Sequence, residues 1–281
     1  MEGDAFPLLF LFHHLLLEVV MKKLGLALGA GGARGIAHIG FLKGLEDNGI
    51  KPDFIAGTSM GSVVGSLYSL GISPSYMIKT ALALRPRDLL DLSPMAIKNG
   101  TLLKSKKMSA LLRRYLHEIQ IEDLKIPFAC VGLDIISGEK VVFTQGDVAT
   151  AVQASSSIPM VFAPIAYENM LVADGAPVCR VPVQEVKNLG ADVVVGVDVL
   201  GPVREMDELK SILGYIIRII DIYDSKVSEL ALEKNPPDIL CTPDLGNMSQ
   251  YKIDSDKMKF AYDKGYEAAL NIVDDLKKKL K

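Results

Sequence analysis

The sequence predicts an α/β domain with a mainly parallel central sheet. From Lys22 onward, short apolar runs alternate with longer segments of helical periodicity, which is the pattern of βαβ units. Glycine-rich turns follow the first two apolar runs. The 281 residues are 49% hydrophobic and 23% charged, so the chain can bury a sizeable core. Since no linker composition divides the chain, we expect a single domain over residues 21–281.

Two βα units open this domain. Their expected elements are a strand at Leu24–Leu28, a helix at Gly35–Asn48, a strand at Phe54–Ala56 and a helix at Met60–Leu70. The following segment, Ser73–Gln120, is predicted to be mainly helical, with breaks at Pro86 and Pro94. It carries a lysine-rich patch at Lys104–Lys107, and most of it is expected to form a solvated cap.

The second half adds strands and two long helices. The expected strands are Phe128–Asp134, Lys140–Thr144, a hairpin over Ile165–Ala173 turning at Glu168-Asn169, Val193–Val199 and Ile239–Cys241. Amphipathic helices are expected at Met206–Leu232 and Ser255–Leu280. The apolar stripe within Ile212–Ile222 is predicted to pack in the core, with an acyl groove or a dimer face as alternatives.

Composition excludes several classes of function. The formal charge of −3 and the absence of a basic stripe argue against nucleic-acid binding. Cys130, Cys179 and Cys241 are isolated in the sequence, so neither a disulfide framework nor a zinc site is indicated, and a reducing, cytoplasmic compartment is expected. No His, Cys, Asp or Glu cluster has metal-ligand spacing, and we predict no cofactor.

The first twenty residues contain an apolar run but match neither a signal peptide nor a membrane anchor. Glu2 and Asp4 stand where a signal peptide needs positive charge, and the run is short and interrupted by polar residues. Because Met21 directly precedes the first clear strand, residues 1–20 are interpreted as an N-terminal extension. Weak binding to a membrane surface or a partner is the alternative.

Two glycine-rich turns indicate the chemistry. Gly29–Gly35 follows a strand and opens a helix, where free backbone N–H groups can face an anion. It lacks the spacing of a dinucleotide fingerprint because Arg34 occupies the third glycine position, but a small-nucleotide binder remains an alternative.

The second turn, Gly57–Gly61, is a G-x-S-x-G between strand and helix, which predicts an exposed nucleophile at Ser59 and an oxyanion donor at the Met60 N–H.

The catalytic base is predicted to be a carboxylate. The four histidines, His13, His14, His38 and His117, all precede the segment where the third member of a Ser–Asp–His order would stand. Asp174 ends an apolar strand just before a glycine turn, where partial burial would raise its basicity. We therefore expect Asp174 to activate Ser59.

Four separated blocks resemble the patatin-like phospholipases and lipid acyl hydrolases, in a bacterial-type member. They are the glycine loop ending in Arg34-Gly35, the Gly57–Gly61 elbow, the Ala154–Pro159 block and Asp174-Gly175-Ala176. The resemblance covers roughly residues 24–200. One departure is Ala30, where many members have a further glycine.

The resemblance implies a three-layer α/β/α fold and a Ser59–Asp174 dyad without histidine. It also implies an oxyanion hole at Gly31, Gly32, Arg34, Gly35 and Met60, with Arg34 holding the loop or adding positive charge. Ser155–Ser157 are expected to shape the pocket, and His38 to be structural.

The function expected is that of a serine esterase of phospholipase A or lysophospholipase type. Its substrate would be a phospholipid or another acyl ester, met during transient contact with a membrane surface. A non-catalytic adaptor with the same fold, an acyltransferase and a thioesterase are alternatives, and homo-oligomerisation is left open.

Overall fold

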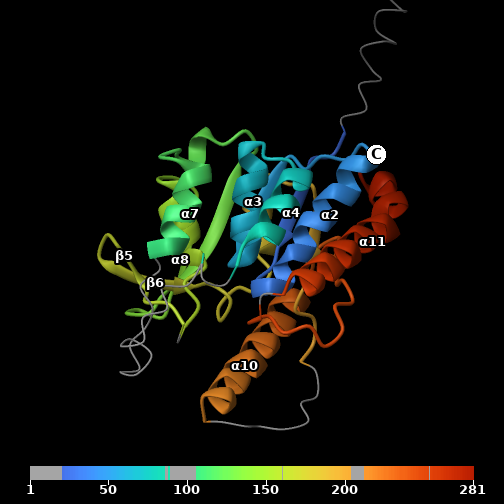
Figure 1. The fold of residues 1–281 in the computed structure, drawn as a ribbon. Coiled ribbons are helices and arrows are strands. Elements are labelled where there is room, and N and C mark those ends of the chain that lie inside the picture. The colour runs from blue at the N-terminus through green and yellow to red at the C-terminus, as the bar shows by residue number, and fades with distance from the viewer. Residues whose placement is uncertain (1–20, 86–87, 89–105, 160, 204–211, 253) are drawn as a thin grey trace, which may run out of the picture.

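The computed structural model describes residues 21–85, 88, 106–159, 161–203, 212–252 and 254–281. Within them, one mixed sheet is flanked by helices (Figure 1). Its strands are β1 (Leu24–Leu28), β2 (Phe54–Thr58), β3 (Phe128–Asp134), β4 (Lys140–Phe143), β5 (Ile165–Tyr167), β6 (Met170–Asp174), β7 (Val193–Val197) and β8 (Ile239–Cys241). The order is β5-β6-β3-β2-β1-β7-β8, and β4 also pairs with β3. Strands β3, β2, β1, β7 and β8 run parallel, whereas β4, β5 and β6 pair antiparallel.

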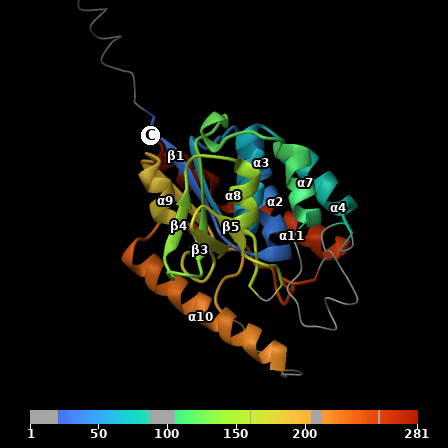
Figure 2. The same ribbon diagram turned by 90° about the vertical axis from the view of Figure 1, so that its left-hand side faces the viewer.

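Helices cover both faces of the sheet. They are α2 (Ile36–Asp47), α3 (Met60–Leu70), α4 (Pro74–Ala83), α7 (Lys106–Leu116), α8 (Val148–Ser155), α9 (Val183–Asn188), α10 (Ile212–Lys234) and α11 (Ser255–Lys279), with short 3-10 turns at Gly32–Gly35 and Ile121–Asp123. Figure 2 shows α9 on one side of the sheet and α2, α3 and α11 on the other. The arrangement confirms the predicted three-layer α/β/α fold.

The two faces of the sheet differ in side-chain size. On β1, Leu24, Leu26 and Leu28 all point to the face covered by α2, α3 and α11, where they join the large core cluster. Ala27 points to the opposite face and joins a small cluster of alanines and valines beneath α9. The thick hydrophobic layer therefore lies on one side, and the short α9 fits closely on the other.

The edge of β3 brings two distant segments into line. Strand β2 pairs with β3 as far as Thr58, opposite Val131, and β6 pairs with the next part of β3, with Asp174 opposite Gly132. Strand β4 pairs with residues of β3 that also pair with β2 and with β6. It must therefore lie along one edge of β3, and β2 and β6 lie end to end along the opposite edge. Consequently, the end of β6 meets the end of β2 head-on, directly beyond Thr58.

The strands follow one another along the chain as the sequence predicts, and some details differ. Helices α8 and α9 were not expected, because each is short and mixes apolar with polar residues. The helix predicted from Gly35 begins at Ile36, after a 3-10 turn. Within Ser73–Gln120, the structure describes α4 and α7, whereas Pro86, Pro94 and Lys104 lie outside the described residues, as do residues 1–20 and Met206.

The prediction that the Ile212–Ile222 stripe packs in the core is wrong. Ile212, Tyr215, Ile216 and Ile219 are exposed. The reason is that α10 is anchored by its second half, where Asp224, Ser225 and Ser228 are buried, while its first turns extend from the body of the protein (Figure 1).

Two glycines let α2 and α11 touch through their backbones. A Cβ on Gly40 of α2 would lie 1.9 Å from the Tyr262 carbonyl oxygen, and one on Gly265 of α11 would lie 1.9 Å from the Ala37 carbonyl oxygen. Nearby, Lys22 N donates to Leu280 O at 3.1 Å, which ties the start of β1 to the end of α11. The C-terminal helix is thus an integral part of the core.

Gly265→Ala should destabilise the fold, although alanine is the better helix former by about 1 kcal/mol. The added methyl group meets backbone, so we expect a loss of roughly 1–3 kcal/mol in the free energy of unfolding, measured in urea. Glu267→Ala, at an exposed position of the same helix, should stay within about 0.5 kcal/mol of the parent. A Gly265→Ala protein as stable as the parent would contradict this backbone contact.

Candidate active site

Ser59 lies on a sharp turn between β2 and α3. Its φ of 54° and ψ of −122° are unusual for a residue with a side chain, and such a conformation costs of order 1–3 kcal/mol. The turn closes because Gly57 and Gly61 lack a Cβ. One on Gly57 would lie 2.5 Å from the Gly61 carbonyl oxygen, and one on Gly61 would lie 2.1 Å from that of Leu28. Both predicted elbow glycines therefore occupy positions where no larger residue fits.

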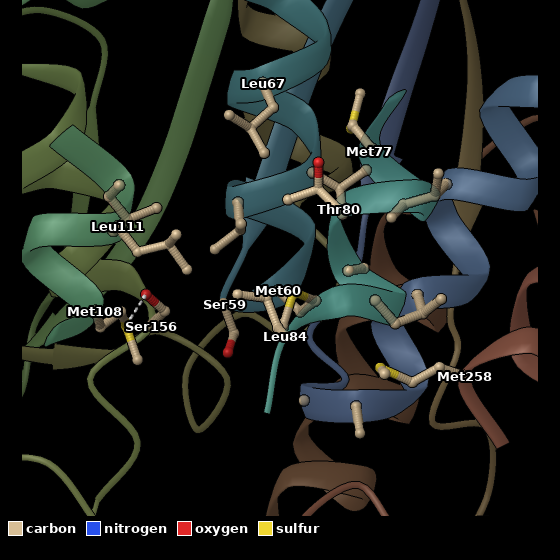
Figure 3. A pocket seen from close by; sticks show the side chains of 18 of the residues that line it. Ser59, Met60, Leu67, Met77, Thr80, Leu84, Met108, Leu111, Ser156 and Met258 are labelled. Atoms are coloured by element: carbon tan, nitrogen blue, oxygen red, sulfur yellow. Dashed lines mark hydrogen bonds between the residues drawn. The ribbon is translucent and has the colours of Figure 1, made fainter. Parts of the chain in front are cut away.

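Backbone hydrogen bonds hold this strained turn in place. Ser59 N donates to Ser155 Oγ at 3.1 Å, and Ser59 O accepts from Ser62 Oγ at 2.6 Å and from Ser62 N at 2.9 Å. Thr58 Oγ1 donates to Cys179 O at 2.9 Å. Figure 3 shows the Ser59 hydroxyl pointing away from α3. The prediction of an exposed Ser59 is wrong, because the residue is only 4% exposed.

Asp174 is the carboxylate that meets Ser59. It is buried at the end of β6, its N–H donates to Ser157 O at 3.0 Å, and its Oδ1 accepts from Ala176 N at 3.0 Å. Burial raises the pKa of Asp174 to about 7, against the opposing effect of hydrogen bonds from the Ser59 hydroxyl and the Ala176 N–H. The predicted nucleophile and base are thus brought together, and the carboxyl group titrates near neutrality.

A buried ionic network lies next to this pair. Arg180 Nη2 contacts Asp224 Oδ2 at 2.8 Å, and Arg180 Nη1 contacts Asp198 Oδ2 at 3.4 Å. The network also fixes backbone, because Arg180 O accepts from Ala30 N at 3.0 Å. The negative charge of Asp224 contributes to the raised pKa of Asp174.

The glycine loop presents its backbone toward the elbow. Gly29 N and Ala33 N donate to Val197 O and Gln250 O, both at 2.9 Å, and these bonds hold the loop between two strands and a later segment. No acceptor in the described part of the chain receives the N–H groups of Gly31 and Gly32. Gly35 packs so closely on the elbow that a Cβ there would lie 2.3 Å from Met60 Cγ.

Arg34 and His38 hold the glycine loop in place through hydrogen bonds to backbone carbonyl groups. Arg34 Nε donates to Val199 O at 2.7 Å, Arg34 Nη1 to Met248 O at 3.3 Å, and Arg34 N to Gly31 O at 3.0 Å. Of the two expected roles for Arg34, the geometry fits that of holding the loop. Buried His38 bonds Gly29 O through Nε2 at 2.8 Å, and burial lowers its pKa to about 4, so the imidazole is neutral and donates this bond.

An apolar cavity of about 320 Å³ opens at Ser59 (Figure 3). Its walls come from α2, α3, α4, α7 and α11, among other segments, and are formed mainly by aliphatic side chains and methionines. They include Met60, Leu67, Met77, Leu84, Met108, Leu111 and Met258. Gln250 and Tyr251 border the cavity, as does Ser156, whose hydroxyl donates to Val152 O at 2.6 Å. Its size and lining suit one flexible apolar chain.

The described residues hold no group of three or more His, Cys, Asp or Glu side chains able to bind a metal ion. Among the described helices, none is both long and apolar enough to cross a membrane. The backbone N–H groups of Gly31, Gly32 and Met60 remain the predicted oxyanion donors.

Sequence reasoning missed the part that Ser155 and Arg180 play. Ser155 accepts the Ser59 N–H across 96 residues of sequence, and Arg180 supports the loop through its carbonyl group. The only signal for Ser155 was its place in the Ala154–Pro159 block, which marked the segment without assigning this bond. For Arg180, the sequence carried no signal, since its partners Asp198 and Asp224 lie on other elements.

Comparison with known proteins places this fold and site in a family. The model of the patatin-like phospholipase family matches residues 26–187, which include both Ser59 and Asp174. The chain belongs to the patatin-like phospholipase family.

Individual relatives share part of the chain. An uncharacterised NTE family protein of Mycobacterium tuberculosis is 34% identical over 189 residues, which are 66% of this chain and 52% of that protein. Lysophospholipase NTE1 of Pyricularia oryzae is 30% identical over 232 residues, 80% of this chain and 15% of that protein. This chain thus spans about half of the mycobacterial relative. The solved structure of VipD from Legionella pneumophila shares the fold, with a TM-score of 0.54 and 14% identity over 91% of this chain and 67% of that one.

Because the backbone is strained at Ser59, replacing it by glycine rather than alanine should stabilise the fold, whereas the same comparison at Ser66 should have the opposite sign. Ser59→Gly should be more stable than Ser59→Ala by about 1 kcal/mol, because glycine tolerates a positive φ. In the α3 interior, Ser66→Gly should be less stable than Ser66→Ala by about the same amount. Thermal unfolding of the four variants measures both differences, and equal signs at the two positions would be inconsistent with a strained Ser59.

Proposed function

We propose that this protein is a serine lipid acyl hydrolase of phospholipase A or lysophospholipase type that uses a Ser59–Asp174 dyad. One observation carries the proposal: a serine held at a positive φ meets a buried carboxyl group of raised pKa at the mouth of an apolar cavity. Membership of the patatin-like phospholipase family supports the same activity.

In the proposed mechanism, the Asp174 carboxylate accepts the Ser59 proton while Ser59 Oγ attacks the ester carbonyl carbon. The carbonyl oxygen becomes an oxyanion, which the N–H groups of Gly31, Gly32 and Met60 stabilise. As the carbon–oxygen bond breaks, Asp174 returns the proton to the departing alcohol. Water, deprotonated by Asp174, then attacks the acyl–enzyme; as the bond to Ser59 Oγ breaks, Asp174 returns the proton to Ser59 and the fatty acid is released. Arg34, Gly35 and His38 position the loop and take no part in proton transfer.

The substrate proposed is a lipid with at least one acyl chain in the cavity. The cavity lining is apolar, and similar curated proteins from Pyricularia oryzae and Aspergillus fumigatus bear the name lysophospholipase. We further propose that residues 21–281 form one hydrolase domain that works in the cytoplasm and contacts membranes transiently. The hydrogen bond between Lys22 and Leu280 supports the single domain.

A fluorophosphonate probe tests the nucleophile directly. The parent protein should be labelled at Ser59, and Ser59→Ala should lose both labelling and ester hydrolysis while remaining folded by circular dichroism. Ser156→Ala, which changes another serine of the cavity, should keep its labelling. Labelling that maps to Ser156 or Ser157, or a parent protein that is never labelled, would refute the proposal; the second result would favour an adaptor.

Asp174→Asn should lower turnover by roughly 10²–10⁴, the usual range for loss of a positioned base. In the parent, kcat should rise with pH through about 7, as the buried carboxyl group loses its proton. If neutral His38 were the base instead, kcat would rise as a group with a pKa of about 4 loses its proton. Stopped ester assays between pH 5 and 9 distinguish the two, and an unchanged rate in Asp174→Asn would remove its catalytic role.

Two carboxyl groups at the same edge of the sheet should affect stability with opposite signs. Because its folded-state pKa is raised, Asp174 destabilises the fold as pH rises through about 7. Asp174→Asn should therefore be more stable than the parent at pH 8 and equal to it below pH 4. Asp134 accepts bonds from Ile136 N and Ser137 Oγ, which lower its pKa, so Asp134→Asn should be less stable at neutral pH and should match the parent in acid. Urea unfolding at both pH values measures the differences, and the same sign for both would contradict the assignment.

A further inference from the structure

Five side chains form an exposed apolar stripe along the first half of α10. They are spaced as i, i+3, i+4, i+7 and i+11, which places them on one face of the helix: Ile212, Tyr215, Ile216, Ile219 and Tyr223. Ile212 is 82% exposed and Tyr223 is 69% exposed. We call these five residues the α10 stripe. In the described part of the chain, no element covers it.

Helix α10 is tied to the surroundings of the cavity that opens at Ser59 through the face opposite the α10 stripe. Asp221, between Ile219 and Tyr223, accepts hydrogen bonds from Gln250 Nε2 and Tyr251 Oη, both at 2.9 Å. Gln250 and Tyr251 line the cavity, and Gln250 O also accepts Ala33 N of the glycine loop at 2.9 Å. One short chain of contacts thus holds α10 near the mouth of the candidate active site, with the α10 stripe on the outward face of the helix.

A second exposed apolar group lies at the same edge of the sheet. Ile135 and Ile136 follow the end of β3, and Ile135 N donates to O of exposed Leu171 at 2.9 Å. Because β3 runs parallel to β2, the end of β3 and Ser59 lie at the same edge. Apolar side chains are therefore exposed at two places around one end of the molecule, and both could contact one flat apolar surface.

The charges at this end suit an anionic surface. The α10 stripe itself carries no charged side chain, and the charge of neighbouring Arg218 is opposed by that of Asp221. Helix α7 supplies Met108 to the cavity, and the two residues before it, Lys106 and Lys107, are exposed and basic. Of the two arginines in its last turn, Arg113 is paired with Asp147. Tyrosines and aliphatic residues on one helix face, next to positive charge, are typical of helices that lie in the interface of a bilayer.

We propose that the α10 stripe docks on the surface of a lipid bilayer that contains anionic lipid, with the Ile135–Ile136 turn as a second contact. The choice of lipid as the partner rests on the proposed function. Docking through this surface brings the cavity mouth to the membrane, so an acyl chain passes from the bilayer toward Ser59 with little exposure to water.

Sedimentation with vesicles tests the docking of the full-length protein. The vesicles contain phosphatidylcholine and phosphatidylglycerol at a 3:1 ratio, or phosphatidylcholine alone. Ile216→Asp should weaken binding to the mixed vesicles by about tenfold or more, since a charge enters the apolar contact. The matched control is Leu270→Asp on α11, because Leu270 is 45% exposed and Ile216 is 40% exposed. It should bind as the parent does, and both variants should hydrolyse a soluble p-nitrophenyl ester normally.

Ile212→Asp provides a second test if Ile216→Asp fails to fold, because its side chain is almost fully exposed. Equal losses in the stripe and control variants, or no binding by the parent, would overturn the proposal. A concentration-dependent dimer that Ile216→Asp dissolves, without vesicle binding, would also overturn it and assign the stripe to a second copy. Vesicle binding is measured without turnover, so Ser59→Ala should bind normally, and a parent that binds but never hydrolyses would refute only the proposed function.

Discussion

The close approach of Gly61 to the Leu28 carbonyl group is the constraint on which the rest of the site depends. It places the start of α3 over the end of β1, and the backbone can reach that position only by passing through the strained conformation at Ser59. The same placement sets Met60 against Gly35, so the glycine loop and the elbow share one contact. The positions of Ser59, the Met60 N–H and the glycine loop thus depend on a single contact between backbones.

Burial makes negative charge unfavourable around this contact, and a buried ion pair compensates for part of that cost. The sheet removes the Asp174 carboxyl group from water, which raises its proton affinity, and the neighbouring charge of Asp224 adds to this effect. Asp224 in turn requires Arg180, whose backbone carbonyl supports the glycine loop. The protein therefore tolerates an unfavourable charge at one place and balances it with an ion pair that also serves the loop. In the proposed mechanism, this raised pKa is what makes a carboxylate a sufficient base without histidine.

Local features could be predicted from the sequence, and contacts between distant segments could not. The strand–glycine–helix units, the elbow glycines and the family resemblance are carried by short stretches of residues, and the structure and the comparisons confirm the fold and the family. The roles of Ser59 and Asp174 stay predictions. The bond from Ser59 N to Ser155 and the alignment of β6 with β2 depend on tertiary packing, which no local pattern encodes. Periodicity identified the apolar face of α10 but carried no information on whether another element covers it, so core packing was wrongly predicted there.

Because β6 and β2 are aligned along one edge of β3, the elements that position Ser59 and Asp174 differ from some of those that line the cavity. Strand β2, which ends just before Ser59, and strand β6, which ends at Asp174, both pair with β3. Part of the cavity wall comes instead from helices α4 and α7, which lie between Ser59 and Asp174 in the sequence. Those helices can lengthen, shorten or change their side chains without moving either residue relative to the other. The shape of this part of the cavity can therefore diverge without moving Ser59 relative to Asp174. Under the proposed function, one sheet scaffold serves acyl chains of different lengths through variation in the segment between these two residues.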